Sequence, residues 1–456
     1  MDTKKLRQKI LDLAIRGKLV PQDPNDEPAS VLLERIKAEK ERLIKEGKIK
    51  RSKKTTKTSD TPHYENVPFE IPENWVWTDI ENICSKIGSG STPRGSNYSS
   101  KGIPFFRSQN IYNNGLVYED IKFISEDIHQ TMIGTEVLPN DLLLNITGGS
   151  LGRCAIVPAN FQRGNVSQHV CIMRPILIVS EYFHAFVLSS SFSKSIKITG
   201  SGREGLPKYN LERIFFPLPP LTEQYRIVSE IEHWFALINQ IEQDKLDLQE
   251  AIKQAKNKIL NIAIHGKLVP QEPSDEPASE LLKRINPKAE ITCDNAHYTQ
   301  LPKGWSVAPM QILCSLIDGN KQNGIERINL DVKYLRGERE PKTLTSGKFI
   351  PANSLLILVD GENSGEVFRT PIEGYQGSTF KQLSINENMN TEYLLQVINF
   401  YRKLLRENKI GSAIPHLNKK LFKEIKVSIP PYKEQQRIVD SINKAFMFLD
   451  MIMENL

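Results

Sequence analysis

One stretch of this sequence occurs twice. Residues 14–36 read AIRGKLVPQDPNDEPASVLLERI and residues 263–285 read AIHGKLVPQEPSDEPASELLKRI, so 18 of 23 positions are identical at an offset of 249. A second block, PPLTEQYRIV at residues 219–228, returns as PPYKEQQRIV at residues 430–439. Long repeats of this kind constrain the whole fold, because each copy is expected to form the same local structure. The sequence therefore predicts two related halves.

The order of the two blocks predicts that the repeat is cyclic. In the middle of the chain the PPxxEQxRIV block runs into the KLVPQ block within residues 219–271. The C-terminus carries only the first block and the N-terminus carries only the second. Joining the two ends would rebuild a copy of the middle segment. We therefore expect a pseudo-two-fold arrangement in which one helical element is cut at the termini.

The middle segment has the apolar spacing of a helical seam. Apolar residues recur at alternating intervals of four and three from Ile227 to Ile262, and ten of the eleven seam positions are apolar. This heptad pattern favours an antiparallel bundle or coiled coil. The alternative is an amphipathic helix packed on a globular core. As an α-helix, residues 227–262 would extend about 54 Å, and we expect one domain near each end.

The two segments between the helical blocks predict domains with a common outline. Each contains a short apolar run, residues 141–146 or 354–359, that is followed by a glycine-rich turn. Such runs are typical of buried strands. The predicted fold class is α+β, with two mixed α/β domains joined by long antiparallel coiled-coil helices. The expected parts are an N-terminal helical repeat with a basic linker (1–60), a first domain (61–218), a central helical spacer (219–296), a second domain (297–429) and a C-terminal spacer helix (430–456).

Composition and motif searches exclude several classes of function. The 456 residues carry 60 Lys+Arg against 54 Asp+Glu, a net charge of +6 that is too mild for a purely electrostatic nucleic-acid binder. The five cysteines include no CxxC pair, which argues against a disulfide framework and a structural zinc site. We find no P-loop, no metal-ligand spacing among the histidines and no nucleophile–base pair. With no signal-peptide core and no apolar stretch of membrane-spanning length, we expect a cytoplasmic, non-catalytic binding subunit.

Residues 37–58 form a separate basic stretch. They contain ten Lys/Arg against three Glu, a net charge of +7. This stretch is either a solvated helix end or a non-specific contact for phosphate groups.

In combination, the repeated blocks resemble the specificity subunits of type I restriction–modification systems. The resemblance rests on KILDLAIRGKLVPQ, KILNIAIHGKLVPQ, PPLTEQYRIV and PPYKEQQRIV, with GIPFFRSQNI at residues 102–111 after the STPR turn at 91–94. It covers essentially the whole chain. The resemblance implies two target-recognition domains, each reading one half of a bipartite, asymmetric double-stranded DNA sequence. It also implies a helical spacer that holds two methyltransferase subunits, and motor-nuclease subunits that join for restriction. S-adenosylmethionine, ATP and Mg²⁺ are then expected on the partner subunits, with no cofactor in this chain.

Arginine suits guanine in the major groove, and glutamine or asparagine suits adenine. The predicted DNA-binding residues of the first domain are Arg94, Tyr98, Arg107, Gln109 and Asn110, with Arg203 and Lys208 as candidate phosphate contacts. Those of the second domain are Lys321, Gln322, Arg327, Arg336 and Arg339, with His416 and Lys419 as candidate phosphate contacts. Arg107 and Arg336, which follow Phe-Phe and Tyr-Leu, are expected in similar places. For each residue the alternative is a solvated charge or a structural ion pair.

Two further functions stay open at this point. The recognition subunit of a type IIB-like or modification-only system would show the same motifs. A coiled-coil scaffold without a DNA role would show the helical pattern alone, and salt-dependent DNA binding by the assembled complex would exclude it.

Overall fold

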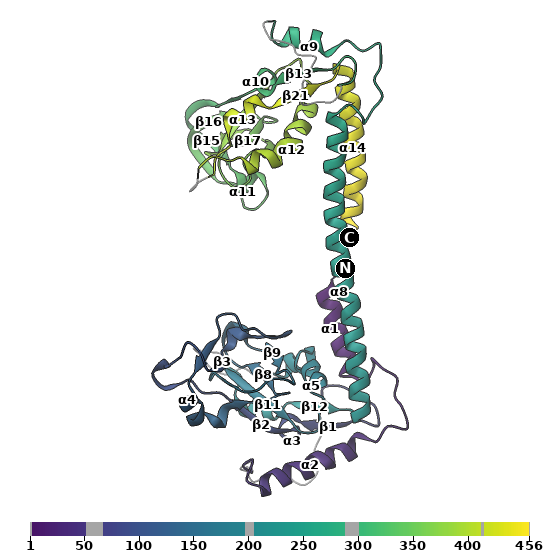
Figure 1. The fold of residues 1–456 in the computed structure, drawn as a ribbon, viewed down its shortest axis with the longest axis vertical. Coiled ribbons are helices and arrows are strands. Elements are labelled where there is room, and N and C mark those ends of the chain that lie inside the picture. The colour runs from purple at the N-terminus through teal and green to yellow at the C-terminus, as the bar shows by residue number, and fades with distance from the viewer. Residues whose placement is uncertain (1, 52–66, 197–204, 288–300, 412–414, 456) are drawn as a thin grey trace. The chain divides into compact units, whose positions relative to one another are not determined.

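The chain consists of two compact units, residues 1–244 and 245–456. The structure is a computed structural model that describes residues 2–51, 67–196, 205–287, 301–411 and 415–455 (Figure 1). The unit boundary lies within α8 (Leu221–Ile264), a helix of 44 residues that contains the predicted seam. The boundary between the two units falls inside the predicted central spacer (219–296).

The first unit packs helices against two four-stranded sheets and also contains the two-stranded sheets β1-β12 and β4-β5. Its helices besides α8 are α1 (Thr3–Ala14), α2 (Ala29–Lys45), α3 (Ile80–Ile83), α4 (Glu126–Thr131), α5 (Ser180–Val187), α6 (Ser190–Ser195) and α7 (Lys208–Glu212). Its strands are β1 (Val76–Asp79), β2 (Cys84–Ser89), β3 (Ile103–Phe106), β4 (Ile111–Tyr112), β5 (Gly115–Leu116), β6 (Lys122–Ile124), β7 (Glu136–Val137), β8 (Leu142–Asn145), β9 (Cys154–Ile156), β10 (Gly164–Val166), β11 (Val170–Pro175) and β12 (Phe215–Leu218). The four-stranded sheets have the orders β2-β11-β8-β9 and β6-β3-β10-β7.

The second unit repeats this outline with a different second sheet. Its helices besides α8 are α9 (Ala278–Ile285), α10 (Met310–Leu313), α11 (Val332–Leu335), α12 (Thr391–Glu407), α13 (Lys419–Glu424) and α14 (Tyr432–Glu454). Its strands are β13 (Ser306–Pro309), β14 (Cys314–Ile317), β15 (Asn320–Leu330), β16 (Thr343–Ile350), β17 (Leu355–Leu358), β18 (Val367–Arg369), β19 (Gly374–Gln376), β20 (Phe380–Ile385) and β21 (Lys426–Ile429). The sheet β14-β20-β17-β18 corresponds to the first sheet of unit one, and β15, β16 and β19 form a small barrel.

The predicted fold class is confirmed, since each unit combines helices with mixed sheets. The apolar runs at 141–146 and 354–359 form the buried strands β8 and β17. The turn before each of these strands contains an asparagine with positive φ, Asn140 (66°) and Asn353 (60°). Asparagine tolerates this conformation better than most residues. The two units therefore share backbone detail as well as strand order.

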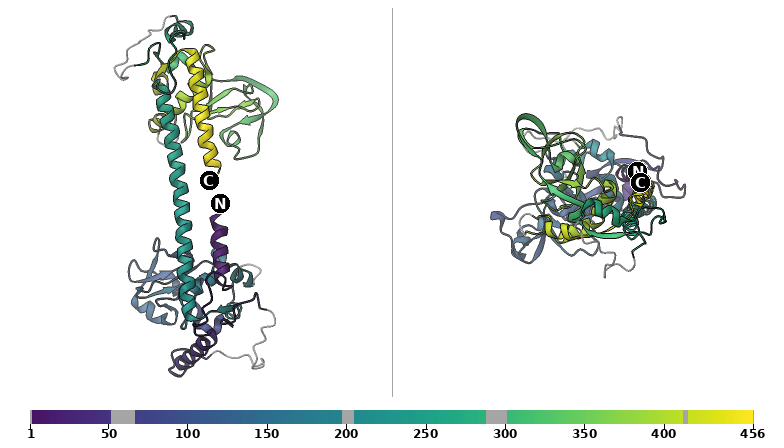
Figure 2. Two further views of the ribbon diagram at one scale, coloured as in Figure 1. Left: turned by 90° about the vertical axis from the view of Figure 1, so that its right-hand side faces the viewer. Right: turned by 90° about the horizontal axis from the view of Figure 1, so that it is seen from above.

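The N-terminal helix lies antiparallel to the first half of α8 (Figure 2). Arg7, near the start of α1, donates to Asn239 Oδ1 (2.7 Å) and Glu242 Oε2 (3.0 Å). Gln22, beyond the end of α1, donates to Glu223 in the first turn of α8 (2.5 Å). The contacts therefore run in opposite directions along the two chains, as the repeat predicts.

The C-terminal helix makes the same arrangement with the second half of α8. Asp450, near the end of α14, pairs with Lys256, whose ammonium group also lies 5.1 Å from the centre of the Phe446 ring. At the other end of α14, Glu434 accepts from Gln271, which lies beyond the end of α8 (3.2 Å). These contacts confirm antiparallel helix pairing within each unit.

The predicted seam is only partly buried. Ile227, Ile238 and Ile252 are nearly inaccessible. Trp234 and Ile241, by contrast, are 40% and 44% exposed. A two-helix contact covers one side of an apolar helix, so seam residues outside that contact stay in solvent. The seam is therefore covered by its partner helix over only part of its length.

A buried carboxylate joins the repeated blocks in each unit. In unit one, Glu223 accepts from Trp75 Nε1 (2.9 Å) and Gln22 Nε2 (2.5 Å). In unit two, Glu434 accepts from Trp305 Nε1 (3.1 Å) and Gln271 Nε2 (3.2 Å). We call these two sets of three residues, Gln22–Trp75–Glu223 and Gln271–Trp305–Glu434, the clamps. Each clamp ties a spacer helix, the loop after the other spacer helix and the first strand region of a domain.

Neighbouring polar groups extend each clamp. Gln224 accepts from the Val179 amide at the start of α5 (3.0 Å), and Gln435 accepts from the Asn390 amide at the start of α12 (3.1 Å). Because these amides lie at helix N-termini, they have no partner inside their own helix. The EQ dipeptide of the repeated block thus binds each domain at two places.

An ion pair holds the loop of each PQxPxDEP sequence to the adjoining helix. Arg226 pairs with Asp26 (2.5 Å) and Arg437 pairs with Asp275 (2.7 Å). The Arg226 guanidinium, through its hydrogen bond, holds the pKa of the Asp26 carboxyl below its usual value. The Asp and Arg positions of the two repeated blocks are therefore explained by contact with each other.

Gly17, beside the clamp of unit one, is closely packed. Gly17 has φ of +65°, and a Cβ at this position would lie 2.4 Å from Pro72 Cγ. Gly47 has a similar φ of +70° but nothing within 4 Å of a Cβ. We predict that Gly47→Ala lowers the free energy of unfolding by about 1 kcal/mol through backbone strain. Gly17→Ala should cost a further 1–3 kcal/mol, roughly, through overpacking. Equal costs in urea unfolding would contradict the packing against Pro72.

Burial of the clamp carboxylate predicts a pH dependence. Desolvation raises the pKa of Glu223 above its usual value, although hydrogen bonds from Trp75 and Gln22 oppose the rise. A raised pKa means that Glu223 contributes most to stability below its unfolded pKa, and that this contribution is lost as pH rises through the folded pKa. Glu223→Gln does not titrate here, so its free energy of unfolding relative to wild type should improve from pH 4 to pH 8. A difference that stays constant with pH would contradict the shift.

Candidate nucleic-acid interface

The clamps lie near the start of the central strand of each unit, β8 or β17. In unit one, the start of β8 lies beside α5, because Asn140 O accepts from Ser180 Oγ (2.9 Å) and α5 in turn binds Gln224. In unit two, Arg369 on β18 pairs with Glu392 in the first turn of α12. The far ends of β8 and β17 therefore lie away from the clamps. We take the loops at these far ends as the candidate interface.

A glycine loop follows the central strand of each unit. Gly148 and Gly152 have φ of 71° and 88°, and Gly361 and Gly365 have φ of 111° and 93°. The Gly152 amide donates to Asn145 O (2.9 Å), as the Gly365 amide does to Leu358 O (2.7 Å). Positive φ favours glycine, and the absence of a Cβ lets a ligand approach the backbone closely. The sequence showed these loops as turns after predicted strands, but we did not assign them to the site.

Polar side chains flank both glycine loops. Thr147 Oγ1 lies 2.8 Å from His169 Nδ1 in unit one, and Asp360 Oδ1 lies 2.7 Å from His416 Nδ1 in unit two. His416 is about half exposed. The structure thus places the predicted His416 at the candidate interface, and adds Thr147, His169 and Asp360, which sequence reasoning missed.

The loop after β3 contains three of the predicted residues, and they have different roles. Gln109 is exposed. Arg107 is partly exposed and donates to Asp120 O (3.1 Å). Asn110 is fully buried, accepts from the Arg107 amide (3.1 Å) and donates to Val117 O (3.0 Å) and Glu119 O (3.1 Å). Asn110 therefore shapes the loop, and the prediction that it contacts bases is wrong for this conformation.

Several polar atoms around this loop have no partner within the described part of the chain. They are Arg107 Nε, Asn145 Oδ1 and Ser167 Oγ, and all three are buried. Asn145 Nδ2 donates to Ser108 O (2.9 Å), and the Ser167 amide donates to Phe106 O (2.9 Å), which places both residues against the loop. Most buried polar groups in proteins are hydrogen-bonded. The described residues therefore leave part of the hydrogen-bonding capacity around this loop unused.

The other candidates of unit one divide into exposed and packed residues. Arg94 is exposed. Lys208 is exposed and pairs with Glu212 at 3.2 Å. The Tyr98 ring packs on Phe105, with ring centres 5.6 Å apart, and so supports the domain core. Arg203 lies outside the described residues.

The long strand β15 carries three candidates of unit two. Lys321 is exposed, and Gln322 is partly buried with no partner for its Oε1 among the described residues. The Arg327 guanidinium lies 4.4 Å from the centre of the Phe349 ring and pairs with Glu373. Arg327 is therefore an internal brace of the barrel, as the ion-pair alternative allowed.

Arg336 and Arg339 are also held by carboxylates. Arg336 pairs with Glu366, which also pairs with Arg402 (2.9 Å) on α12. Arg339 pairs with Asp331 at the start of α11. Both arginines are about 30% exposed. Arg336 joins the α11 segment to Glu366 and Arg339 closes the segment on itself, which favours the structural alternative for both positions.

The expected equivalence of Arg107 and Arg336 is wrong. Phe106 lies opposite Val166 in a parallel pair, and Leu330 lies opposite Gln376 in the matching parallel pair. The residue equivalent to Arg107 is therefore Asp331. The similar letters Phe-Phe-Arg and Tyr-Leu-Arg fall on different parts of the two units.

Lys419 and the basic stretch complete the list of predicted contacts. Lys419 is exposed in the first turn of α13. In the described part of the basic stretch, residues 37–51, four of the seven Lys/Arg form ion pairs with nearby glutamates. Its ion pairs are Lys37–Glu34, Arg42–Glu39, Arg42–Glu46, Lys48–Glu46 and Arg51–Glu41. These pairs favour a solvated helix end for this part, and residues 52–58 lie outside the described residues.

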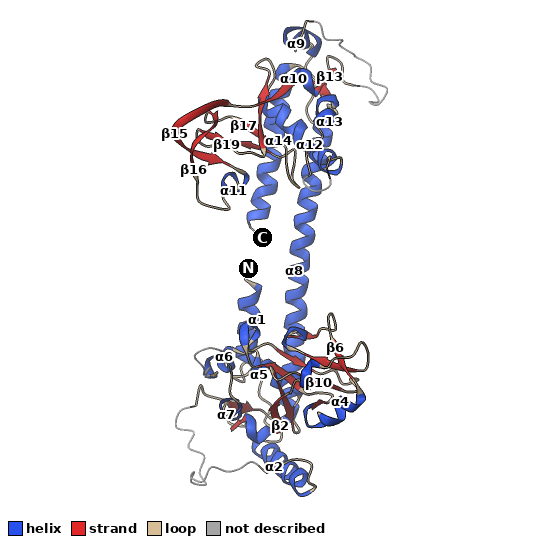
Figure 3. Cartoon of the chain, turned by 90° about the vertical axis from the view of Figure 1, so that its left-hand side faces the viewer, coloured by secondary structure: helices blue, strands red, loops and turns tan. Residues whose placement is uncertain are grey.

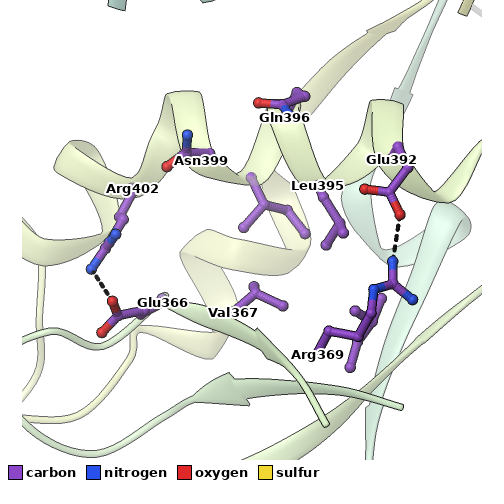
Figure 4. Close-up of a pocket in the computed structure, with 11 residues that line it drawn as sticks. Glu366, Val367, Arg369, Glu392, Leu395, Gln396, Asn399 and Arg402 are labelled. Atoms are coloured by element: carbon purple, nitrogen blue, oxygen red, sulfur yellow. Dashed lines mark hydrogen bonds and ion pairs between the residues drawn. The ribbon is translucent and has the colours of Figure 1, made fainter. Parts of the chain in front are cut away.

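A groove of about 300 Å³ lies between β18 and α12 (Figure 4). Its floor contains Leu355 and Val367, and the pairs Arg369–Glu392 and Arg402–Glu366 cross its rim. Because each carboxylate is paired with an arginine, the groove contains no free acid or base for catalysis. Among the described residues no group of His, Cys, Asp or Glu has the arrangement of a metal site. No described helix has the length and apolarity to cross a membrane.

Comparisons with known proteins agree with this arrangement. The family model of the type I restriction modification DNA specificity domain matches residues 72–250 and 317–452. The specificity subunit of the Escherichia coli type I restriction enzyme EcoAI is 31% identical over 385 residues, which are 69% of this chain and 63% of that subunit. The EcoEI specificity subunit from the same species is 34% identical over 339 residues, 62% of this chain and 54% of that subunit. The matched region is thus less than two thirds of either relative's length.

A solved structure shows a similar fold. The HsdS subunit from Thermoanaerobacter tengcongensis aligns with a TM-score of 0.51 at 17% identity, covering 85% of this chain and 93% of that one. At this level of identity the likeness supports the fold alone.

Neighbouring residues of the β3 loop allow structure and recognition to be separated. Asn110→Ala would leave the Val117 and Glu119 carbonyls without their donors, and we predict a loss of about 1–3 kcal/mol in the free energy of unfolding. Gln109→Ala removes an exposed side chain and should change it by less than about 0.5 kcal/mol. Urea unfolding of the two variants tests this prediction, and similar costs would contradict the assigned roles.

Proposed function

This chain belongs to the type I restriction modification DNA specificity family, and we propose that it is the DNA-reading subunit of a type I restriction–modification complex. In this proposal each unit reads one half of a bipartite double-stranded DNA target. Because the two units have different loops, the two half-sites differ in sequence. The chain performs no chemistry itself.

The observation that carries the proposal is that the two units share one scaffold, whereas the parts built on that scaffold differ. Both units have the same clamp and the same parallel strand pair, β3–β10 and β15–β19. The parts built on this scaffold differ, since β7 in unit one has two residues and the corresponding β16 in unit two has eight. Two readers of unlike sequences require such an arrangement, because the scaffold must stay constant while the contacts change.

The proposed DNA contacts are polar residues that are exposed or partly exposed. We assign direct reading to Arg94, Arg107 and Gln109 in the first unit, and to Lys321 and Gln322 in the second. Lys208, His416 and Lys419 would contact phosphate groups. Arg327, Arg336, Arg339, Tyr98 and Asn110 would hold the loops in shape. Arg203 keeps its place as a candidate on sequence grounds alone.

Exposed apolar residues on the helices support the proposed modification subunits. In unit one, Trp234, Leu237 and Ile241 on α8 are each 40–44% exposed. In unit two, four residues near the end of α14 are 47–52% exposed: Met447, Phe448, Met451 and Ile452. Clusters of this kind typically mark protein contact surfaces. We propose that two methyltransferase subunits bind these helices, one per unit.

The remaining components of the proposal lie on partners. Methyltransferase subunits would carry S-adenosylmethionine, and motor-nuclease subunits would carry ATP and Mg²⁺. The complex would act on DNA in the cytoplasm. A type IIB-like or modification-only system is the alternative assembly, and identification of the partner proteins in a pull-down from the host separates it from the full restriction complex. A scaffold without a DNA role predicts no sequence-specific binding at all.

We predict that the complex with its modification subunits protects two DNA blocks separated by an indifferent gap. Gln109→Ala should weaken binding to the cognate target by about 1–3 kcal/mol and relax specificity within one block only, because a paired base contact is lost. Footprinting and binding to target variants measure both effects.

Lys208→Ala is the matched control for this experiment. Loss of a phosphate contact should weaken binding to all sequences equally. It should also reduce the slope of log K against log salt concentration by about one. A single continuous protected block, or equal losses on all sequences for Gln109→Ala, would contradict the proposed function.

A further inference from the structure

The strands β15 and β16 form a two-stranded ribbon that is longer than its counterpart in unit one (Figure 3). These strands contain 11 and 8 residues. The corresponding strands of unit one, β3 and β7, contain four and two. The ribbon is thus the largest addition to the shared outline, and it lies in the part of unit two that carries Lys321 and Gln322.

A bulge interrupts the ribbon and exposes an isoleucine. Asn323 pairs with Ser346 and Arg327 pairs with Leu344, so three residues on β15 oppose one on β16. Gly324, with φ of +78°, begins the bulge, and Ile325 within it is 45% exposed. Leu344, opposite Arg327, is 42% exposed. Two large aliphatic side chains therefore stand in solvent on a polar ribbon.

Buried contacts hold the bulge in place. The Tyr375 hydroxyl donates to Ile325 O (2.7 Å), and Tyr375 is fully buried. Its ring packs on Gly347, where a Cβ would lie 2.6 Å from the ring. Arg327 is fixed next to the bulge by Phe349 and Glu373. Because this anchoring comes from the core side, the exposure of Ile325 is a built feature of the ribbon and not a loose turn.

The surroundings of the ribbon suit DNA better than a second apolar surface. Lys321 on β15 and Lys342, just before β16, are exposed, and neither forms an ion pair within the described part of the chain. Gln322 and Asn323 add side-chain amides on the same strand. The major groove of B-DNA admits a two-stranded ribbon, and its apolar feature is the 5-methyl group of thymine, which aliphatic side chains contact.

We propose that Ile325 and Leu344 are specificity-determining residues that read thymine methyl groups in the half-site of the second unit. The proposal rests on the proposed function and names the base feature that the ribbon recognises. In this assignment the lysines hold the ribbon to phosphate groups, and the two aliphatic side chains distinguish thymine from cytosine at the same position.

Removal of single methyl groups from the DNA tests the proposal. The complex of the full chain with its modification subunits is assayed on its target, with each thymine of the second half-site replaced in turn by uracil. Wild type should lose about fourfold in affinity at one or two of these positions, as expected for one buried methyl group. Ile325→Ala or Leu344→Ala should bind more weakly and should no longer distinguish thymine from uracil at its own position.

Val31→Ala, which shortens a comparably exposed side chain (42%) on α2, is the matched control and should keep the full thymine preference. A second half-site without thymine, or an undiminished preference in both ribbon variants, would overturn the proposal. So would loss of the modification subunits from the ribbon variants, which would assign the pair to a protein contact. In each of these cases wild type still protects two blocks, whereas failure of the proposed function would remove that protection.

Discussion

The rest of the structure depends on one buried carboxylate in each unit. Glu223 and Glu434 lose hydration when the units fold, and desolvation raises the pKa of both. Burial of a carboxylate is unfavourable unless donors replace water. The donors here are a tryptophan from the domain and a glutamine from the loop after the other spacer helix. Since three distant segments must meet to satisfy one acceptor, the interaction fixes where each domain meets its helices.

Much of this organisation follows from the sequence. The repeated blocks predicted the paired helices, and the apolar runs predicted β8 and β17, because both signals depend on local spacing. The partners of Glu223 could not be predicted, since Trp75 and Gln22 lie 148 and 201 positions away. The repeat showed that these residue types recur together, but not that one of them accepts from the other two.

The candidate site was predictable in part, and the errors have a physical reason. Gln109 in a loop and Lys321 on β15 are exposed, as a contact residue requires. Arg336 is instead held in an ion pair, and its partner Glu366 is 30 positions away and belongs to another element. Arg336 is not equivalent to Arg107, because Leu330, and not Leu335, occupies the register position of Phe106. An arginine in a loop shows its charge in the sequence, but its availability depends on carboxylates that folding brings near.

The separation of the clamp from the glycine loops has a consequence for how such chains diverge. The exposed side chains of Arg94 and Ile325 make few contacts that the fold requires, so most changes to them alter little of the folding free energy. The clamp tolerates much less change, because loss of one partner strands a buried polar group. Under the proposed function, substitutions in exposed loops would therefore change the recognised DNA sequence at little cost to folding, while the clamp keeps its contacts. Because each unit has its own clamp, the loops of one unit can change independently of the loops of the other.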